Sequence, residues 1–112
     1  MNKQIIYTTI KTIITLFKEC NYQKIIDLDQ KGVLEQDDFK EILGDSCSEV
    51  TDIPEDQFEN NCHIYELDSP HECLVQFDFW IDNKKSDLTM TCRIIEISNT
   101  IYSYAIENFR IL

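Results

Sequence analysis

The first 43 residues repeat apolar side chains at helical spacing. Ile6, Ile10, Ile13 and Phe17 stand at i, i+4, i+7 and i+11, which predicts a long amphipathic helix. Many of its residues are β-branched and have low helix propensity, so tertiary packing must stabilise it. Two shorter helices follow with the same period. The predicted helices cover residues 3–19, 22–29 and 35–43.

Glycine and proline mark the ends of these segments. Gly32 and Gly44 supply the left-handed positions that end the second and third helices. Residues 46–61 then read as a linker. Within it, Pro54 is followed by two acidic residues, which predicts one turn of helix leading to Phe58.

Beyond the linker the period changes to two, which is typical of strands. The clearest case alternates Val75, Phe77, Phe79 and Ile81 with Gln76, Asp78, Trp80 and Asp82. The predicted strands cover residues 62–67, 73–82, 86–97 and 101–111. Tight turns join them, so the sequence predicts an α+β fold. In it one long and two short N-terminal helices pack on a four-stranded antiparallel meander, within a single domain of residues 1–112.

Length and hydropathy narrow the class of protein. A chain of 112 residues with 43 % hydrophobic content forms one globular domain. It has no run of 18 apolar residues, so we expect no membrane span. Lys11 interrupts the apolar N-terminal stretch and no small-residue cleavage site follows, which argues against a signal peptide. We therefore expect a cytoplasmic protein.

The five cysteines are unevenly scattered. They are Cys20, Cys47, Cys62, Cys73 and Cys92. An odd number without paired spacing argues against a disulfide framework. We expect reduced thiols, partly buried as small apolar groups.

Charge is distributed very unequally along the chain. No lysine or arginine lies between Lys40 and Lys84, whereas this stretch carries 12 of the 21 acidic residues. The net charge of −11 therefore comes from this block. Such a block repels nucleic acid and anionic membranes and attracts a basic protein surface.

Two patterns suggest a metal site, and both fit poorly. Residues 27–38 place acids and a glycine as in a calcium loop, but Lys31 occupies a ligand position and Asp38 replaces the bidentate glutamate. A helix end followed by a turn explains the same residues. Residues 62–73 hold two cysteines and two histidines, yet Cys62 and His63 are adjacent on a strand and point to opposite faces. We expect no metal and no cofactor.

Catalytic motifs are absent from the sequence. The chain has two histidines and two glycines, with no phosphate-binding loop and no nucleophile or zinc-protease motif. Cys73, His71 and His63 are the only candidates for an active site. We therefore expect no enzymatic activity.

The outer face of the second predicted strand is a candidate surface for binding a partner protein. Asp78, Trp80 and Asp82 alternate along it. An exposed indole between two carboxylates would anchor a lysine or arginine of a partner. Equally, Trp80 could be a structural residue covered by tyrosines or by the linker.

The C-terminal third resembles a family of small uncharacterised bacterial proteins. The residues from Trp80 to Thr89 (WIDNKKSDLT) are similar to its W…-x-S-D-L-T segment, and those from Tyr104 to Leu112 (YAIENFRIL) to its last strand. The Gly32 turn and the spacing of Pro54 and Phe58 follow the same rhythm. The resemblance implies an α+β fold and carries no catalytic residue.

In size, acidity and lack of catalytic groups the chain also resembles immunity proteins of contact-dependent growth inhibition. That resemblance implies a protein that binds a cognate basic toxin domain, often a nuclease, and covers its active site, as a monomer or 1:1 heterodimer. The expected contacts are Asp52, Glu55, Asp56, Glu59, Glu66, Asp68, Glu72, Asp78, Trp80 and Asp82. The alternative is a small-ligand module with a pocket between helix and sheet, lined by Tyr102, Tyr104, Trp80 and Phe79.

Overall fold

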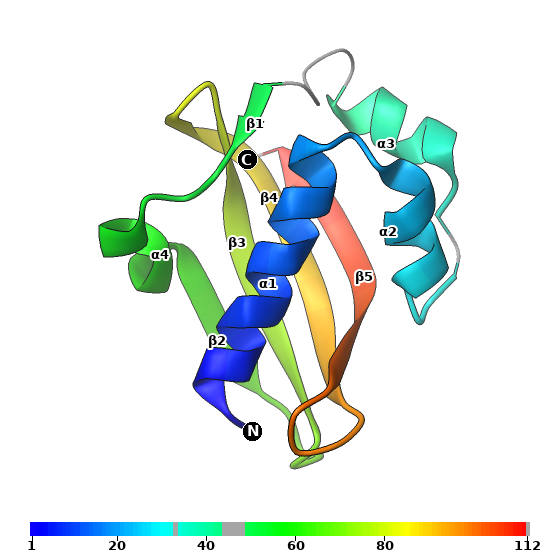
Figure 1. The fold of residues 1–112 in the computed structure, drawn as a ribbon, viewed down its shortest axis with the longest axis vertical. Helices are drawn as coiled ribbons and strands as arrows, with labels where there is room; N and C mark the ends of the chain where they lie inside the picture. Colours follow the sequence, from blue (N-terminus) through cyan, green and yellow to red (C-terminus); the bar gives the residue numbers. More distant parts are fainter. Residues whose placement is uncertain (33, 44–48, 112) are drawn as a thin grey trace.

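The protein has an α+β fold in which N-terminal helices pack on an antiparallel sheet (Figure 1). The computed structural model describes residues 1–32, 34–43 and 49–111. The helices are α1 (Lys3–Lys18), α2 (Tyr22–Leu28), α3 (Gln36–Leu43) and α4 (Glu55–Asn61). The strands are β1 (Val50–Thr51), β2 (Cys62–Glu66), β3 (Glu72–Ile81), β4 (Lys84–Glu96) and β5 (Tyr102–Ile111). Gly44, expected to end the third helix, and Cys47 lie outside the described residues.

Helix α1 has well-defined ends. The side chain of Asn2 accepts hydrogen bonds from the backbone N–H groups of Gln4 and Ile5, which satisfies two of the free donors of the first turn. At the other end Cys20 takes a left-handed conformation, with φ 54°. Gly32, with φ 67°, also provides the left-handed turn expected of it, although α2 already ends at Leu28.

The sheet contains the predicted meander and one additional strand. Strands β2 to β5 pair in sequence order, and β2 places Cys62 opposite Phe77 rather than Cys73. The prediction of four strands was wrong by one, because β1 pairs with the end of β3 beside β2. Two residues are too short to show a period of two, so the linker hid this strand.

The turn between β3 and β4 lies one residue earlier than predicted. Its two central residues are Asp82 and Asn83, with φ of 53° and 61°, and Ile81 pairs directly with Lys84. Asp and Asn tolerate the left-handed region better than other side chains, so they suit a two-residue hairpin of type I′. The expectation of a loop at residues 83–85 was therefore wrong.

The core lies between α1 and one face of the sheet. Helix α1 runs across the sheet, while α2 and α3 lie beside β5 (Figure 1). The inward side chains of β3, Val75, Phe77 and Phe79, are fully buried against the helix, which confirms the predicted face. Consequently both the helical and the strand periodicity identified the sides that face the core.

Candidate functional site

Most of the predicted contact residues gather on one edge of the sheet. The segment of residues 49–68 forms β1, α4 and β2, which all lie along the β3 edge (Figure 1). It contains seven acidic residues, all exposed, and no lysine or arginine. We call these residues the acidic flank: Glu49, Asp52, Glu55, Asp56, Glu59, Glu66 and Asp68. Six were predicted as contacts; Glu49 was missed, although it belongs to the same charged block.

Helix α4 turns the acids of this segment outward. Pro54 precedes it, and Glu55 and Asp56 stand in its first turn, where carboxylates interact favourably with the helix dipole. Phe58 is its apolar anchor: its ring packs edge-on against Tyr7 of α1, with centroids 5.4 Å apart. Burying Phe58 on one side of a short helix leaves the acidic side chains on the other.

Two lysines of α1 partly neutralise the flank. The Nζ of Lys11 lies 2.8 Å from Glu55 and that of Lys18 lies 2.8 Å from Asp52. The side chains of Glu55 and Asp52 are 81 % and 68 % exposed, so these ion pairs add little stability. Within the described part of the chain, no ion pair involves Asp56, Glu59 or Glu66. The flank therefore keeps an excess of negative charge.

Three predicted carboxylates lie outside the segment of residues 49–68. Glu72 lies 3.6 Å from Arg93. Asp78 is half-buried between Lys85, at 3.4 Å, and the hydroxyl of Thr89, which donates a hydrogen bond to it. Asp82 is exposed in the β3–β4 turn and lies next to the flank, because its backbone N–H donates to the carbonyl of Glu49 at 2.7 Å. Glu72 and Asp78 are thus engaged by neighbouring cations.

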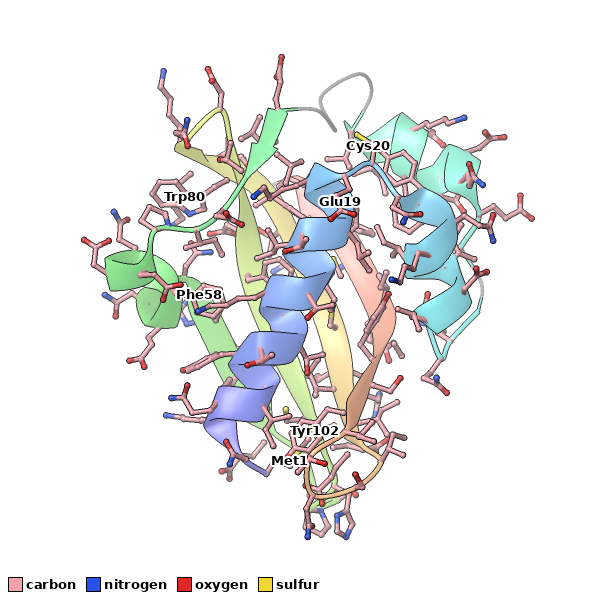
Figure 2. The ribbon with its side chains drawn as sticks, in the orientation of Figure 1. Met1, Glu19, Cys20, Phe58, Trp80 and Tyr102 are labelled. Carbon is pink, nitrogen blue, oxygen red and sulfur yellow. The ribbon has the colours of Figure 1, made fainter. Side chains whose placement is uncertain are left out.

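Trp80 is a structural residue. Only 9 % of Trp80 is exposed. Its backbone pairs with Thr51 of β1, so the segment of residues 49–61 covers it. Figure 2 shows Trp80 beside the segment that leads from β1 to α4. The interpretation of Trp80 as an exposed anchor for a partner is therefore wrong. Its indole Nε1 is buried without a hydrogen-bond partner among the described residues.

The pocket predicted between helix and sheet is not formed by its four expected residues. Phe79 and Trp80 are consecutive and point to opposite faces of β3. Tyr104 is buried and its hydroxyl donates to the carbonyl of Ile25 at 2.8 Å. Burial, with the nearby charge of Asp29, raises the pKa of Tyr104 well above its usual value. Phe79, Trp80 and Tyr104 are buried in the core, whereas Tyr102 is partly exposed and its hydroxyl donates to Glu96 at 3.2 Å.

The candidate metal ligands and catalytic residues do not converge. Among residues 1–32, 34–43 and 49–111, no group of three His, Cys, Asp or Glu side chains could hold a metal ion. His63 pairs with Gln76 on the outer face of the sheet, whereas Cys73 is buried on the inner face. His71 lies at the hairpin, where its Nδ1 is 3.1 Å from Glu96. Asp29 of the calcium-like loop instead accepts a hydrogen bond from the backbone N–H of Lys31, at 3.0 Å.

The cysteines differ in state. Cys20 is disulfide-bonded, so the expectation of reduced thiols is wrong there. Cys62, Cys73 and Cys92 are free and buried, as expected. Burial raises the pKa of the Cys62 thiol to about 12, with Lys11 opposing and Asp78 adding to the shift. Burial likewise raises the pKa values of Cys73 and Cys92.

We predict that these three thiols resist alkylation in the folded protein. Only the thiolate reacts, and both burial and the raised pKa suppress it. Iodoacetamide at pH 8 should modify them at least about 100-fold more slowly than in the urea-unfolded chain. Mass spectrometry of time points measures the rates. Rapid modification of Cys62 in the native state would contradict the described packing of α4 and β2.

The described part of the chain contains no helix that is both long and apolar enough to cross a membrane.

The chain belongs to the family described as a domain of unknown function (DUF7668), whose model matches residues 14–112. This match includes the whole acidic flank. No curated protein and no solved structure matches the chain.

Proposed function

We propose that this chain is an inhibitory binding protein, without enzymatic activity of its own, that neutralises a basic partner protein. The partner is of the kind that immunity proteins oppose: a toxin domain, such as a nuclease, whose basic active site the inhibitor covers. The observation that supports this proposal is the acidic flank, seven exposed carboxylates on one edge of the sheet.

The negative charge of the acidic flank favours fast and selective association with a basic partner. A nuclease carries positive charge where nucleic acid binds, and an acidic surface is attracted to that place. Such steering raises association rates by about 10- to 1000-fold and weakens steeply with salt. It also blocks the substrate, because both compete for the same basic residues.

We place the protein in the cytoplasm, where an inhibitor meets a toxin before or after its entry. Disulfides are rare in the cytosol, so the disulfide at Cys20 is the feature by which this location is tested. Counting free thiols by mass spectrometry, in protein taken directly from its own cells, distinguishes the cytoplasm from an oxidising compartment. A blocked Cys20 in that sample would move the proposed location to an oxidising compartment.

Charge reversal on the flank tests the proposal. The partner to use is the product of the gene immediately upstream, and the measurement is stopped-flow association at 50 and 300 mM salt. We expect a 1:1 complex whose association rate falls about tenfold or more with salt. The double variant Asp56→Lys/Glu59→Lys should slow association by a further factor of about ten while dissociation changes less.

The matched control is Asp37→Lys/Glu41→Lys, which makes the same charge change at exposed positions of α3. This helix lies beside β5, at the opposite edge of the sheet from the acidic flank (Figure 1). It should slow association much less than the flank variant. Equal slowing by both variants would mean that only net charge matters and that the flank is not the interface. No complex at either salt concentration would refute the inhibitor function for this partner.

A further inference from the structure

One edge of the sheet is covered by another segment of the chain, and the other edge is open. The β5 edge is covered by the segment after α2: Asp29 bridges to Tyr104, and the backbone N–H of Gln30 donates to the Tyr104 carbonyl at 2.9 Å. At the other edge β2 pairs with β3 alone, and no described strand pairs with its outer side. An open strand edge presents unpaired backbone donors and acceptors that another strand can bind.

Hydrogen bonds of neighbouring side chains show which backbone groups of β3 face β2. Asn61, next to β2, donates through Nδ2 to the carbonyl of Asp78 at 2.9 Å. Ser86 of β4 donates to the carbonyl of Phe79 at 2.6 Å. Backbone groups alternate in direction along a strand, so the even-numbered residues of β3 face β2.

The register then identifies the outward groups of β2. Its residues 63 and 65 lie opposite residues 76 and 74, whose backbone groups face them. Ile64 therefore directs both its N–H and its C=O away from β3. Cys62 has the same direction, and its N–H indeed donates to the carbonyl of Phe58 in α4. Ile64 is thus the centre of the open edge.

A groove of about 600 Å³ runs along this edge. All five residues of β2 line it, although their side chains alternate between the two faces of the sheet. The groove therefore opens on the edge of the strand itself. Its opposite wall is formed by Lys3 and Tyr7 of α1 with Glu59 and Asn60 of α4. Tyr65, which is 51 % exposed, lies beside it as a large uncovered aromatic side chain.

The groove continues at both ends, and its charge is negative. A hollow of about 510 Å³ shares Lys3, Ile64 and Glu66 with it, and one of about 230 Å³ shares Tyr7, Glu59 and Asn60. The charged residues that line the three together are Glu55, Asp56, Glu59, Glu66, Glu72, Lys3 and Lys11. Five acids thus face two lysines and the amino group of Met1; Lys11 is paired with Glu55, and Glu72 with Arg93.

We propose that β2 is the docking edge for an extended segment of the partner protein, which adds to the sheet as a further antiparallel or parallel strand. This inference rests on the proposed function and specifies how the basic partner is held. The segment carries lysine or arginine at alternate positions, so that its backbone pairs with Ile64 while its cations reach Glu59 and Glu66. About five residues, or 17 Å of extended chain, match the length of β2.

Charge selects this occupant over a second copy of the same chain. Pairing two β2 edges would bring two acidic flanks together on chains of net charge −11 each. Like charges opposed in this way disfavour the pair, whereas a basic segment gains from the same field.

The test uses the full chain and a seven-residue probe of alternating lysine and valine, capped at both ends. The variant is Ile64→Pro, which removes the outward N–H but no bond to β3, and the control is Ile64→Ala, which shortens the side chain but keeps the N–H. We expect calorimetry to show binding to the wild type and to Ile64→Ala, and about tenfold or more weaker binding to Ile64→Pro. In the wild type, the probe should slow hydrogen exchange of the Ile64 amide.

Two results would overturn the docking edge: no binding of the probe at millimolar concentration, or binding that leaves the Ile64 amide exchanging freely. If Ile64→Pro does not fold, the exchange measurement on the wild type decides alone. Protection of Ile64 at high protein concentration without probe would assign the edge to a second copy instead. A cognate partner that binds Ile64→Pro normally would refute the edge and leave the inhibitor function intact; a protected edge without any cognate partner would do the reverse.

Discussion

Replacing Phe17 by alanine should destabilise the protein by about 3–5 kcal/mol. Phe17 is fully buried at the centre of an aromatic cluster that joins α1 to four other elements, α2, α3, β3 and β5. Its ring centroid lies 4.9 Å from that of Phe79, 5.6 Å from Phe39 and 5.9 Å from Phe109. Removing the ring loses its buried apolar area and leaves a cavity among rigid neighbours that cannot close around it. Urea unfolding followed by circular dichroism measures the loss.

Phe17→Leu is the matched control, because leucine retains most of the apolar volume and should cost about 1–1.5 kcal/mol. Since small domains have a total stability of about 5–15 kcal/mol, the alanine variant should lie near the limit of folding. A loss below about 1 kcal/mol for Phe17→Ala, with an unchanged denaturant slope, would show that the cluster is not packed as described.

The fold could be predicted largely because its periodicity is long and regular. The stripe of α1 and the alternation of β3 each repeat over ten or more residues, and both identified their buried faces. Strand β1 could not be found this way, because Val50 and Thr51 pair with β3 only through tertiary structure. The hairpin turn was displaced because Lys84 and Lys85 look polar and turn-like, yet Asp82 and Asn83 accept the left-handed conformation at less cost.

The candidate site was predictable in charge but not in shape. A block without lysine or arginine marks an acidic surface wherever it folds, and most of its exposed acids do lie on one edge. Trp80 was ambiguous for a physical reason: alternation places it on the outer face, but only the pairing of β1 determines that it is covered. The open edge of β2 has no sequence signal, since it depends on which strands do not pair.

Asp29→Ala should cost about 2–4 kcal/mol and open the other edge of the sheet. Asp29 is 7 % exposed, and its Oδ1 accepts hydrogen bonds from the backbone N–H groups of Ile106 in β5 and of Lys31, each at 3.0 Å. Alanine leaves the buried N–H of Ile106 without an acceptor, and water cannot replace it without separating the segment from β5. Denaturant unfolding gives the free energy, and hydrogen exchange at Ile106 locates the damage.

The comparison that isolates this role is Asp29→Asn, which keeps an acceptor oxygen in place of Oδ1 and should recover more than half of the lost stability. The exchange of the Ile106 amide should be about as slow in Asp29→Asn as in the wild type, and much faster in Asp29→Ala. If both variants were equally unstable, the charge of Asp29 rather than its acceptor would hold β5. In Asp29→Ala the β5 edge would be open as well as the β2 edge, so the variant should also self-associate at high concentration. Sedimentation velocity measures this self-association directly.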